Sequence, residues 1–223
     1  MAKKGELEND KKKKLDKCNR NCRMLEVIFL KKIILKMVYV ATTSPRRIEL
    51  LEQFGFDYKL VKPCKEKLII NSKQDLAVQK AISKIECLHI DGLVVAFDTI
   101  VVFKDKIFEK PKNIEEAKSM LYDLSGSWHS VISAIAIKYK DLIKAYFEKT
   151  FVKFAKLEKN DIDFLTSKEN VLDKAGAYAI QGYAALYIEK IVGDYYNVVG
   201  LPLNRFKKIL EDDFKLKKSD YLK

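Results

Sequence analysis

The chain has 223 residues, 48% of them hydrophobic, which is an ordinary composition for a globular protein. Its net charge of +12 would suit a nucleic-acid binder, but seven of those charges fall within the first 36 residues. The remainder is only mildly basic and has no basic stripe interleaved with aromatic residues, so a nucleic-acid partner is not expected.

The first 36 residues differ from the rest of the chain. The run Lys11–Lys14 has no apolar partner, so residues 1–36 are predicted to be a disordered basic extension. The apolar stretch Met24–Leu35 is too short for a membrane span, which needs about 20 apolar residues, and no cleavage site for a secretory signal follows it. We therefore expect one domain over residues 37–223. The extension is interpreted either as an amphipathic helix or as an upstream stretch that is seldom translated.

The domain begins with a buried strand at 38–41 and a helix that starts after Ser44. Serine is a favoured N-cap, and Pro45 suits the first helical position. Arg46 and Arg47 then occupy the first turn, where the helix dipole favours anions over cations. The pattern indicates a phosphate site made of backbone N–H groups, the Ser44 hydroxyl and two guanidinium groups. A pair of solvated surface arginines is the alternative.

A strand at 57–62 and a helix at 73–88 come next, and each is associated with one candidate site residue. Glu66 lies in the loop after the strand, where a carboxylate could hold a metal ion. Lys80 borders the apolar stripe of the helix, which predicts its ammonium group near the rim of a cleft. For both residues an ordinary surface position is the alternative.

The longest apolar run, 92–103, is predicted to be a buried strand, and Asp98 and Thr99 interrupt it. Because an unpaired buried carboxylate is costly, Asp98 is expected either to bond backbone N–H groups or to stand at a cleft mouth. In a cleft it could act as a general base toward water or hold a divalent cation. Thr99 could bond substrate or simply occupy a strand position. Lys110, after the next strand, could meet a phosphate as a point charge.

The second half of the chain continues the alternation of helices and strands, which predicts an α/β fold. Gln181 offers both a donor and an acceptor, as reading a nucleobase edge requires. It lies in one of two glycine-containing blocks, 173–182 and 193–202, that are predicted to be irregular. Common dinucleotide and P-loop motifs are absent from the sequence. The other expected elements are a capped helix at 113–124, β-rich segments at 127–139 and 145–157, a helix at 160–168, a strand at 184–192, and a helix after Pro202.

The four cysteines, Cys18, Cys22, Cys64 and Cys87, have no spacing typical of a metal site. Unpatterned cysteines indicate a reducing compartment, so a cytoplasmic location is expected.

Five sequence blocks occur in the order and spacing of a known family: ATTSPRRIELLEQFGF, AFDTIVVF with EKP, MLYDLSGSWHSV, LDKAGAYAIQG and GDYYNVVGLPL. From Met37 to about Leu210 the chain resembles the Maf family of nucleoside triphosphate pyrophosphatases. The resemblance implies a two-lobed, mixed-sheet α/β fold with a central cleft, similar to the inosine triphosphate pyrophosphatases. It also implies hydrolysis of a nucleoside triphosphate to monophosphate and pyrophosphate with a divalent cation, Mg or Mn. Maf proteins are often dimeric, which makes a homodimer an expectation.

The resemblance also implies roles for individual residues. Asp98 matches the catalytic proton acceptor, and Glu66 together with Asp98 is expected to bind the metal, although Lys65 stands where many members have another acid. The residues expected to bind substrate are Ser44, Arg46, Arg47, Lys80, Thr99, Lys110 and Gln181.

In the family, the positions of Arg46, Thr99 and Gln181 are associated with substrate choice. The branch that acts on 7-methylguanosine triphosphate tends to carry Trp in place of Arg46 and Glu in place of Gln181, so this chain resembles the dTTP/UTP branch. It departs from the family at Phe97 and Glu109, where a small residue and glycine are usual. Phe97 is expected to alter the cleft wall, and Glu109 to weaken the hold of Lys110 on phosphate. The alternatives are the 7-methylguanosine triphosphate activity and a septum or cell-division regulator that only binds nucleotide.

Overall fold

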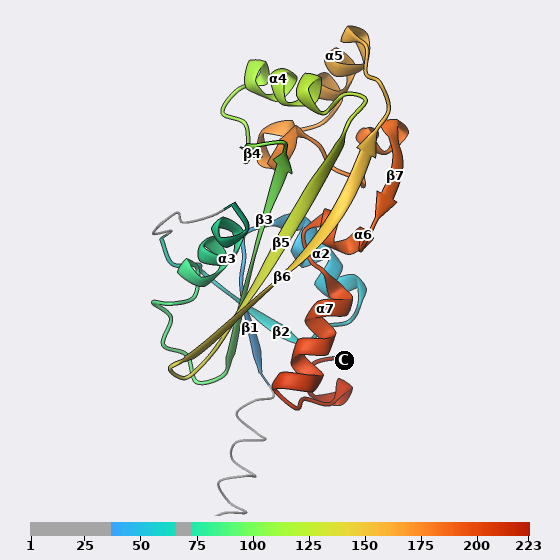
Figure 1. Ribbon diagram of the computed structural model, residues 1–223. Coiled ribbons are helices and arrows are strands. Elements are labelled where there is room, and N and C mark those ends of the chain that lie inside the picture. The colour runs from blue at the N-terminus through green and yellow to red at the C-terminus, as the bar shows by residue number, and fades with distance from the viewer. Residues whose placement is uncertain (1–36, 66–72) are drawn as a thin grey trace, which may run out of the picture.

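The structure is a computed structural model that describes residues 37–65 and 73–223. Within these residues, the strands form one seven-stranded sheet in the order β2-β1-β3-β5-β6-β7, with β4 paired to β3 (Figure 1). β1 is parallel to β2 and β3, whereas all other pairings are antiparallel. The strands are β1 (Val38–Ala41), β2 (Tyr58–Val61), β3 (Leu93–Phe103), β4 (Lys106–Phe108), β5 (Trp128–Tyr139), β6 (Leu142–Phe154) and β7 (Ile188–Val192).

Helices cover both faces and one end of this sheet. In Figure 1, α3 lies on one side of the lower half of the sheet and α2 and α7 on the other, while α4 and α5 lie at the upper end. The described part of the chain contains no helix long and apolar enough to cross a membrane. The helices are α2 (Pro45–Gln53), α3 (Lys73–Ser83), α4 (Ile114–Leu124), α5 (Lys159–Lys168), α6 (Tyr195–Val199) and α7 (Leu203–Lys208).

The long strand β3 is buried on both faces, which explains the apolar residues on both sides of Asp98 and Thr99. Val95 and Phe97 belong to a core that includes residues of α2 and α7, and Ala96 and Ile100 belong to a core that includes residues of α3. A further core joins α4 and α5 to the far end of the strands. The predicted α/β class and two-lobed arrangement are thus confirmed, with an open mixed sheet running through both lobes.

Two predicted segments near the C-terminus are wrong. Only Ile188–Val192 of the expected strand at 184–192 pairs as a strand, because Tyr183–Tyr187 forms a 3₁₀ helix. The block 193–202, predicted to be irregular, contains α6. Asp194 caps this short helix, since its carboxylate accepts hydrogen bonds from the backbone N–H groups of the next turn at 2.7 and 3.2 Å.

Two cysteines that the sequence left unassigned form a disulfide. Cys64, after β2, is bonded to Cys87, after α3, across a separation of 23 residues. The backbone N–H of Cys64 also donates to the Lys84 carbonyl at 3.0 Å. This pairing contradicts the interpretation of the cysteines as unpatterned and removes the argument for a reducing compartment that rested on them. Residues 1–36 and Glu66 lie outside the described residues.

Candidate active site

A cleft of about 590 Å³ opens where the two lobes meet. This volume falls within the range of roughly 300–1,000 Å³ that small-molecule sites occupy. Its walls come from the start of α2, the middle of β3, the second half of α3, the loop before β7 and the end of α6. Every predicted site residue that the structure describes lines the cleft: Ser44, Arg46, Arg47, Lys80, Asp98, Thr99, Lys110 and Gln181.

The first turn of α2 presents the predicted phosphate-binding groups to the cleft. Ser44 occupies the N-cap position in an extended conformation, with Pro45 beginning the helix, as the sequence predicts. The Ser44 side chain makes no capping hydrogen bond; its backbone N–H instead donates to Thr42 Oγ1 at 3.2 Å. The first-turn N–H groups of a helix have no intrahelical acceptor, so this end of α2 is suited to an anion.

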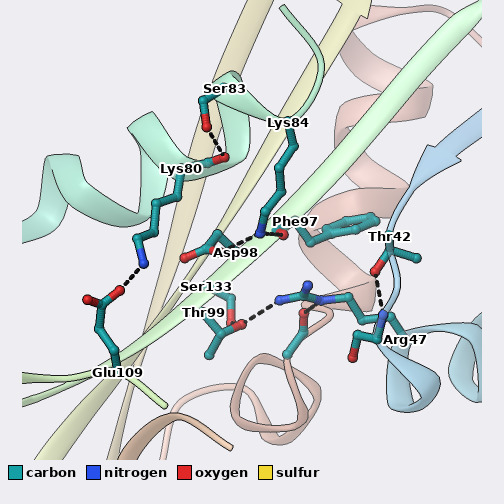
Figure 2. Close-up of polar contacts among 12 residues, drawn as sticks. Thr42, Arg47, Lys80, Ser83, Lys84, Phe97, Asp98, Thr99, Glu109 and Ser133 are labelled. Carbon is teal, nitrogen blue, oxygen red and sulfur yellow. Dashed lines mark hydrogen bonds and ion pairs between the residues drawn. The ribbon is translucent and has the colours of Figure 1, made fainter. Parts of the chain in front are cut away.

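Arg47 is held from two sides inside the cleft (Figure 2). Its Nε donates to the Gly200 carbonyl at 2.9 Å, and its Nη2 donates to Thr99 Oγ1 at 3.0 Å. Burial lowers the pKa of Arg47 to about 10, against the opposing effect of the Asp98 charge, and the nearby Arg46 lowers it further. A guanidinium at this pKa remains charged at neutral pH, so Arg47 is a fixed cation aimed at the cleft.

Arg46 reaches across the cleft to Asp173, in the segment that precedes β7. Its guanidinium lies 3.8 Å from an Asp173 carboxylate oxygen and donates to the Asp173 carbonyl at 3.4 Å. Burial opposes ionisation of Asp173, but the Lys174 hydrogen bond and the charges of Lys174, Arg46 and Lys110 bring its pKa below the ordinary value. Asp173 is therefore an anionic partner for Arg46 that was not predicted from the sequence.

Asp98 lines the cleft and is paired with a lysine. Lys84 Nζ lies 2.5 Å from Asp98 Oδ1 and also donates to the Phe97 carbonyl at 3.2 Å (Figure 2). Of the two readings of Asp98, the cleft position is therefore the one that the structure supports. Lys84 was missed, although it follows Lys80 by one helical turn and so projects from the same side of the chain.

Lys80 bonds Glu109, which stands on the opposite side of the cleft. The Glu109 carboxylate thus engages Lys80, and its expected effect on the hold of Lys110 on phosphate stays a prediction. Lys110 and Gln181 are exposed at the cleft.

Phe97 does not form part of the cleft wall. Its side chain is fully buried and packs edge-on against Phe206, with ring centroids 5.3 Å apart. The guanidinium carbon of Arg47 lies 5.9 Å from the Phe97 ring centroid, within the range of a cation–π contact. The bulky residue thus supports Arg47 from the core side, contrary to the expectation that it alters the wall.

The predicted metal pair is only half described. Asp98 lies in the cleft, whereas Glu66 lies outside the described residues. Across residues 37–65 and 73–223, no three His, Cys, Asp or Glu side chains gather closely enough to hold a metal ion. A cation at Asp98 would accordingly need ligands from elsewhere, such as the phosphate oxygens of a substrate.

A third missed residue, Asn197, joins α6 to the sheet from a fully buried position. Its Oδ1 accepts from the Ser133 N–H at 3.2 Å, and its Nδ2 donates to the Val131 carbonyl at 3.1 Å. Its place in a block without clear periodicity gave no indication of burial. An asparagine between two tyrosines and two valines, in Tyr195–Val199, is the feature that could have pointed to it.

Comparison with known proteins agrees with this geometry. Three curated relatives carry the name dTTP/UTP pyrophosphatase. The Thermosipho melanesiensis protein is 45% identical over 177 residues, 78% of this chain and 97% of its own. The Thermosipho africanus protein is 41% identical over 177 residues, 78% and 92% of the two chains. One from Bacillus cereus (strain ATCC 10987 / NRS 248) is 38% identical over 182 residues, 79% and 90% of the two chains.

The family model described as Maf-like protein matches residues 37–213, a span that contains every strand of the sheet and every cleft residue described above. The chain belongs to the Maf family.

Proposed function

We infer that this chain hydrolyses nucleoside triphosphates, dTTP and UTP first among them, to the monophosphate and pyrophosphate. The observation that carries this function is the arrangement of the cleft, where Asp98 and the first turn of α2 face a common space (Figure 2). The names of the relatives, all dTTP/UTP pyrophosphatases, support the choice of substrate.

The cleft residues would have two roles, the binding of phosphate and the activation of water. Arg47 and the N-terminus of α2 would bind phosphate oxygens, since a guanidinium and backbone N–H groups are strong anion donors. Arg46 and Lys80 would exchange their present carboxylate partners for phosphate oxygens. Asp98 would accept a proton from the attacking water, which requires a hydrogen bond between the carboxylate and that water. The arginines would stabilise the charge that develops on the departing pyrophosphate.

A divalent cation, Mg or Mn, is part of the proposal. Mg²⁺ is commonly held by one or two carboxylates together with substrate phosphates, and Asp98, the described member of the predicted metal pair, fits that mode. Glu66 is proposed as a second ligand. When bound, the cation would offset the charge of the triphosphate and favour the loss of pyrophosphate. Lys84, now at 2.5 Å from Asp98, would then share or release the carboxylate.

The remaining expectations are also retained as proposals. A homodimer and a cytoplasmic location agree with an enzyme of nucleotide metabolism, and no nucleic-acid partner is proposed. A regulator that only binds nucleotide is disfavoured, because such a protein has no need of a carboxylate at Asp98.

The test is pyrophosphate release over a panel of nucleoside triphosphates that includes dTTP, UTP and 7-methylguanosine triphosphate. We expect the highest kcat/KM with dTTP or UTP. Asp98→Asn should abolish turnover while the fold is kept, because an amide is nearly isosteric but does not accept the proton.

A matched control is Asp123→Asn, which alters an acid that pairs with Lys106 away from the cleft. It should leave turnover unchanged. Near wild-type activity of folded Asp98→Asn would contradict the assigned role, and a panel without any hydrolysis would contradict the function.

A further inference from the structure

A chain of hydrogen bonds leads from Arg47 in the cleft to the backbone of α6. Arg47 Nη2 donates to Thr99 Oγ1 at 3.0 Å, and Thr99 Oγ1 lies 2.8 Å from Ser133 Oγ. Ser133 Oγ in turn donates to the Asn197 carbonyl at 2.8 Å. Thr99 and Ser133 are register partners on the adjacent strands β3 and β5, so their hydroxyls lie side by side (Figure 2).

The direction of each bond follows from the number of hydrogens available. A carbonyl oxygen only accepts, so the single hydroxyl hydrogen of Ser133 is committed to Asn197. Thr99 must therefore donate its own hydrogen to Ser133, and it meets Arg47 as an acceptor. All three hydrogen bonds are therefore donated in the same direction, away from the Arg47 cation. Hydrogen bonds in such a chain polarise one another when they are buried.

The far end of this chain is held firmly. Ser133 and Asn197 are fully buried, and the Asn197 side chain bonds β5 at the Ser133 N–H and the Val131 carbonyl. Its Nδ2 also donates to Thr150 Oγ1 of β6 at 2.9 Å. The acceptor of the Ser133 hydroxyl is thus fixed relative to two strands of the sheet.

We propose that Ser133 is a positioning residue that acts on the substrate through Thr99 and Arg47. Ser133 Oγ accepts a hydrogen bond from the Thr99 hydroxyl. This bond keeps the Thr99 oxygen turned toward Arg47 as an acceptor. This inference rests on the proposed function, because the group that Arg47 would address is a phosphate of the substrate.

The geometry of Arg47 explains why its orientation matters. Two of its five N–H groups have protein acceptors among the described residues, Thr99 Oγ1 and the Gly200 carbonyl, and these two bonds define the plane of the guanidinium. The other N–H groups are left for phosphate oxygens. Without the Ser133 hydroxyl, Thr99 can rotate and donate into the cleft, and Arg47 loses one of the two bonds that fix this plane.

The experiment compares Ser133→Ala with Ser130→Ala in the full chain. Ser130 is a matched control, since it is also a buried serine of β5 and its hydroxyl bonds a backbone carbonyl, that of Val102, at 3.4 Å outside this chain of hydrogen bonds. We expect Ser133→Ala to lower kcat/KM for dTTP by about ten- to a hundredfold, as misplacement of a positioning group does. Its affinity for inorganic pyrophosphate, measured by titration calorimetry, should fall by about tenfold. Ser130→Ala should stay close to wild type in both measurements.

A second pair of variants separates the hydroxyl from packing. Thr99→Ser keeps the hydroxyl and should be impaired less than Thr99→Val, which removes it and should resemble Ser133→Ala. The proposal is overturned if Ser133→Ala matches Ser130→Ala, or if both Thr99 variants are equally impaired. A wild-type protein that hydrolyses no triphosphate would instead refute the proposed function, and the pyrophosphate titration would still test the role of Ser133.

Discussion

The three residues implied in base choice differ in how they are engaged. Thr99 forms hydrogen bonds with Arg47 and Ser133, and Arg46 is paired with Asp173, so both residues already interact with other side chains. Gln181 is exposed on the loop that closes one side of the cleft. At the scale of single residues, Gln181 is therefore the group best placed to read a base.

Changing Gln181 to Glu should alter base preference. The amide can donate to a pyrimidine carbonyl and accept from the ring N–H, whereas a carboxylate loses the donor and repels the carbonyl edge. We expect kcat/KM for dTTP and UTP to fall about tenfold, since one hydrogen bond at a site is worth ~1–3 kcal/mol. Activity on 7-methylguanosine triphosphate should fall less or rise.

The control for this prediction is Gln53→Glu, which makes the same chemical change at an exposed position at the end of α2, outside the cleft. An equal loss on all substrates in Gln181→Glu would mean that Gln181 shapes the cleft without reading the base.

At the scale of elements, α6 connects the sheet to the cleft in only five residues. Asp194 fixes its start, and Gly200 ends it with a φ of 113°, a conformation that other residues rarely adopt. The Gly200 carbonyl is the acceptor for Arg47 Nε. The end of this helix therefore sets the position of a cleft cation.

Gly200→Ala should impair both stability and catalysis. The added Cβ would lie 3.3 Å from Thr99 Oγ1, and the positive φ would be strained. We expect a loss of about 1 kcal/mol or more in the free energy of unfolding. Displacement of the Gly200 carbonyl should also lower kcat/KM severalfold.

Gly55→Ala is the comparison, because Gly55 has a φ of +66° and nothing within 4 Å of an added Cβ. It should lose stability through φ alone and keep its kcat/KM. If Gly200→Ala retains full activity, the end of α6 does not position Arg47.

At the scale of the whole molecule, the sequence predicted the sheet and the cleft residues better than the contacts among them. The runs that form β1 and β3 are largely apolar, so their burial could be deduced from residue type alone. The partners Lys84 and Asp173 could not, because pairing depends on where distant segments meet. The Cys64–Cys87 bond was missed for the same reason, and α6 is too short to show helical periodicity.

The buried side chain of His129 is expected to make the stability of the fold depend on pH. His129 Nε2 lies 2.7 Å from the Tyr178 hydroxyl, and its Nδ1 has no hydrogen-bond partner within the described part of the chain. Burial lowers the pKa of His129 to about 4, below the unfolded value of about 6.5. The unfolded chain therefore binds a proton more readily, and its population grows as the pH falls from about 6.5 toward 4.

We expect this histidine to remove about 2 kcal/mol from the free energy of unfolding between pH 7 and pH 5. Urea denaturation of the wild type, His129→Gln and His89→Gln at several pH values would measure it. The slope should flatten in His129→Gln and persist in His89→Gln, since His89 is exposed. Equal slopes in all three proteins would contradict the prediction.

Among the described residues, the ion pairs Arg46–Asp173 and Lys80–Glu109 cross the cleft, so the protein itself supplies counter-ions to these cations. An incoming polyanion would displace carboxylates that are tethered to the chain in addition to mobile ions from the solvent. Fewer dissolved ions would be released on binding, so affinity should vary less steeply with ionic strength than the charge of a triphosphate alone would predict. The displaced carboxylates would remain beside the bound anion, ready to re-form their pairs and assist its departure.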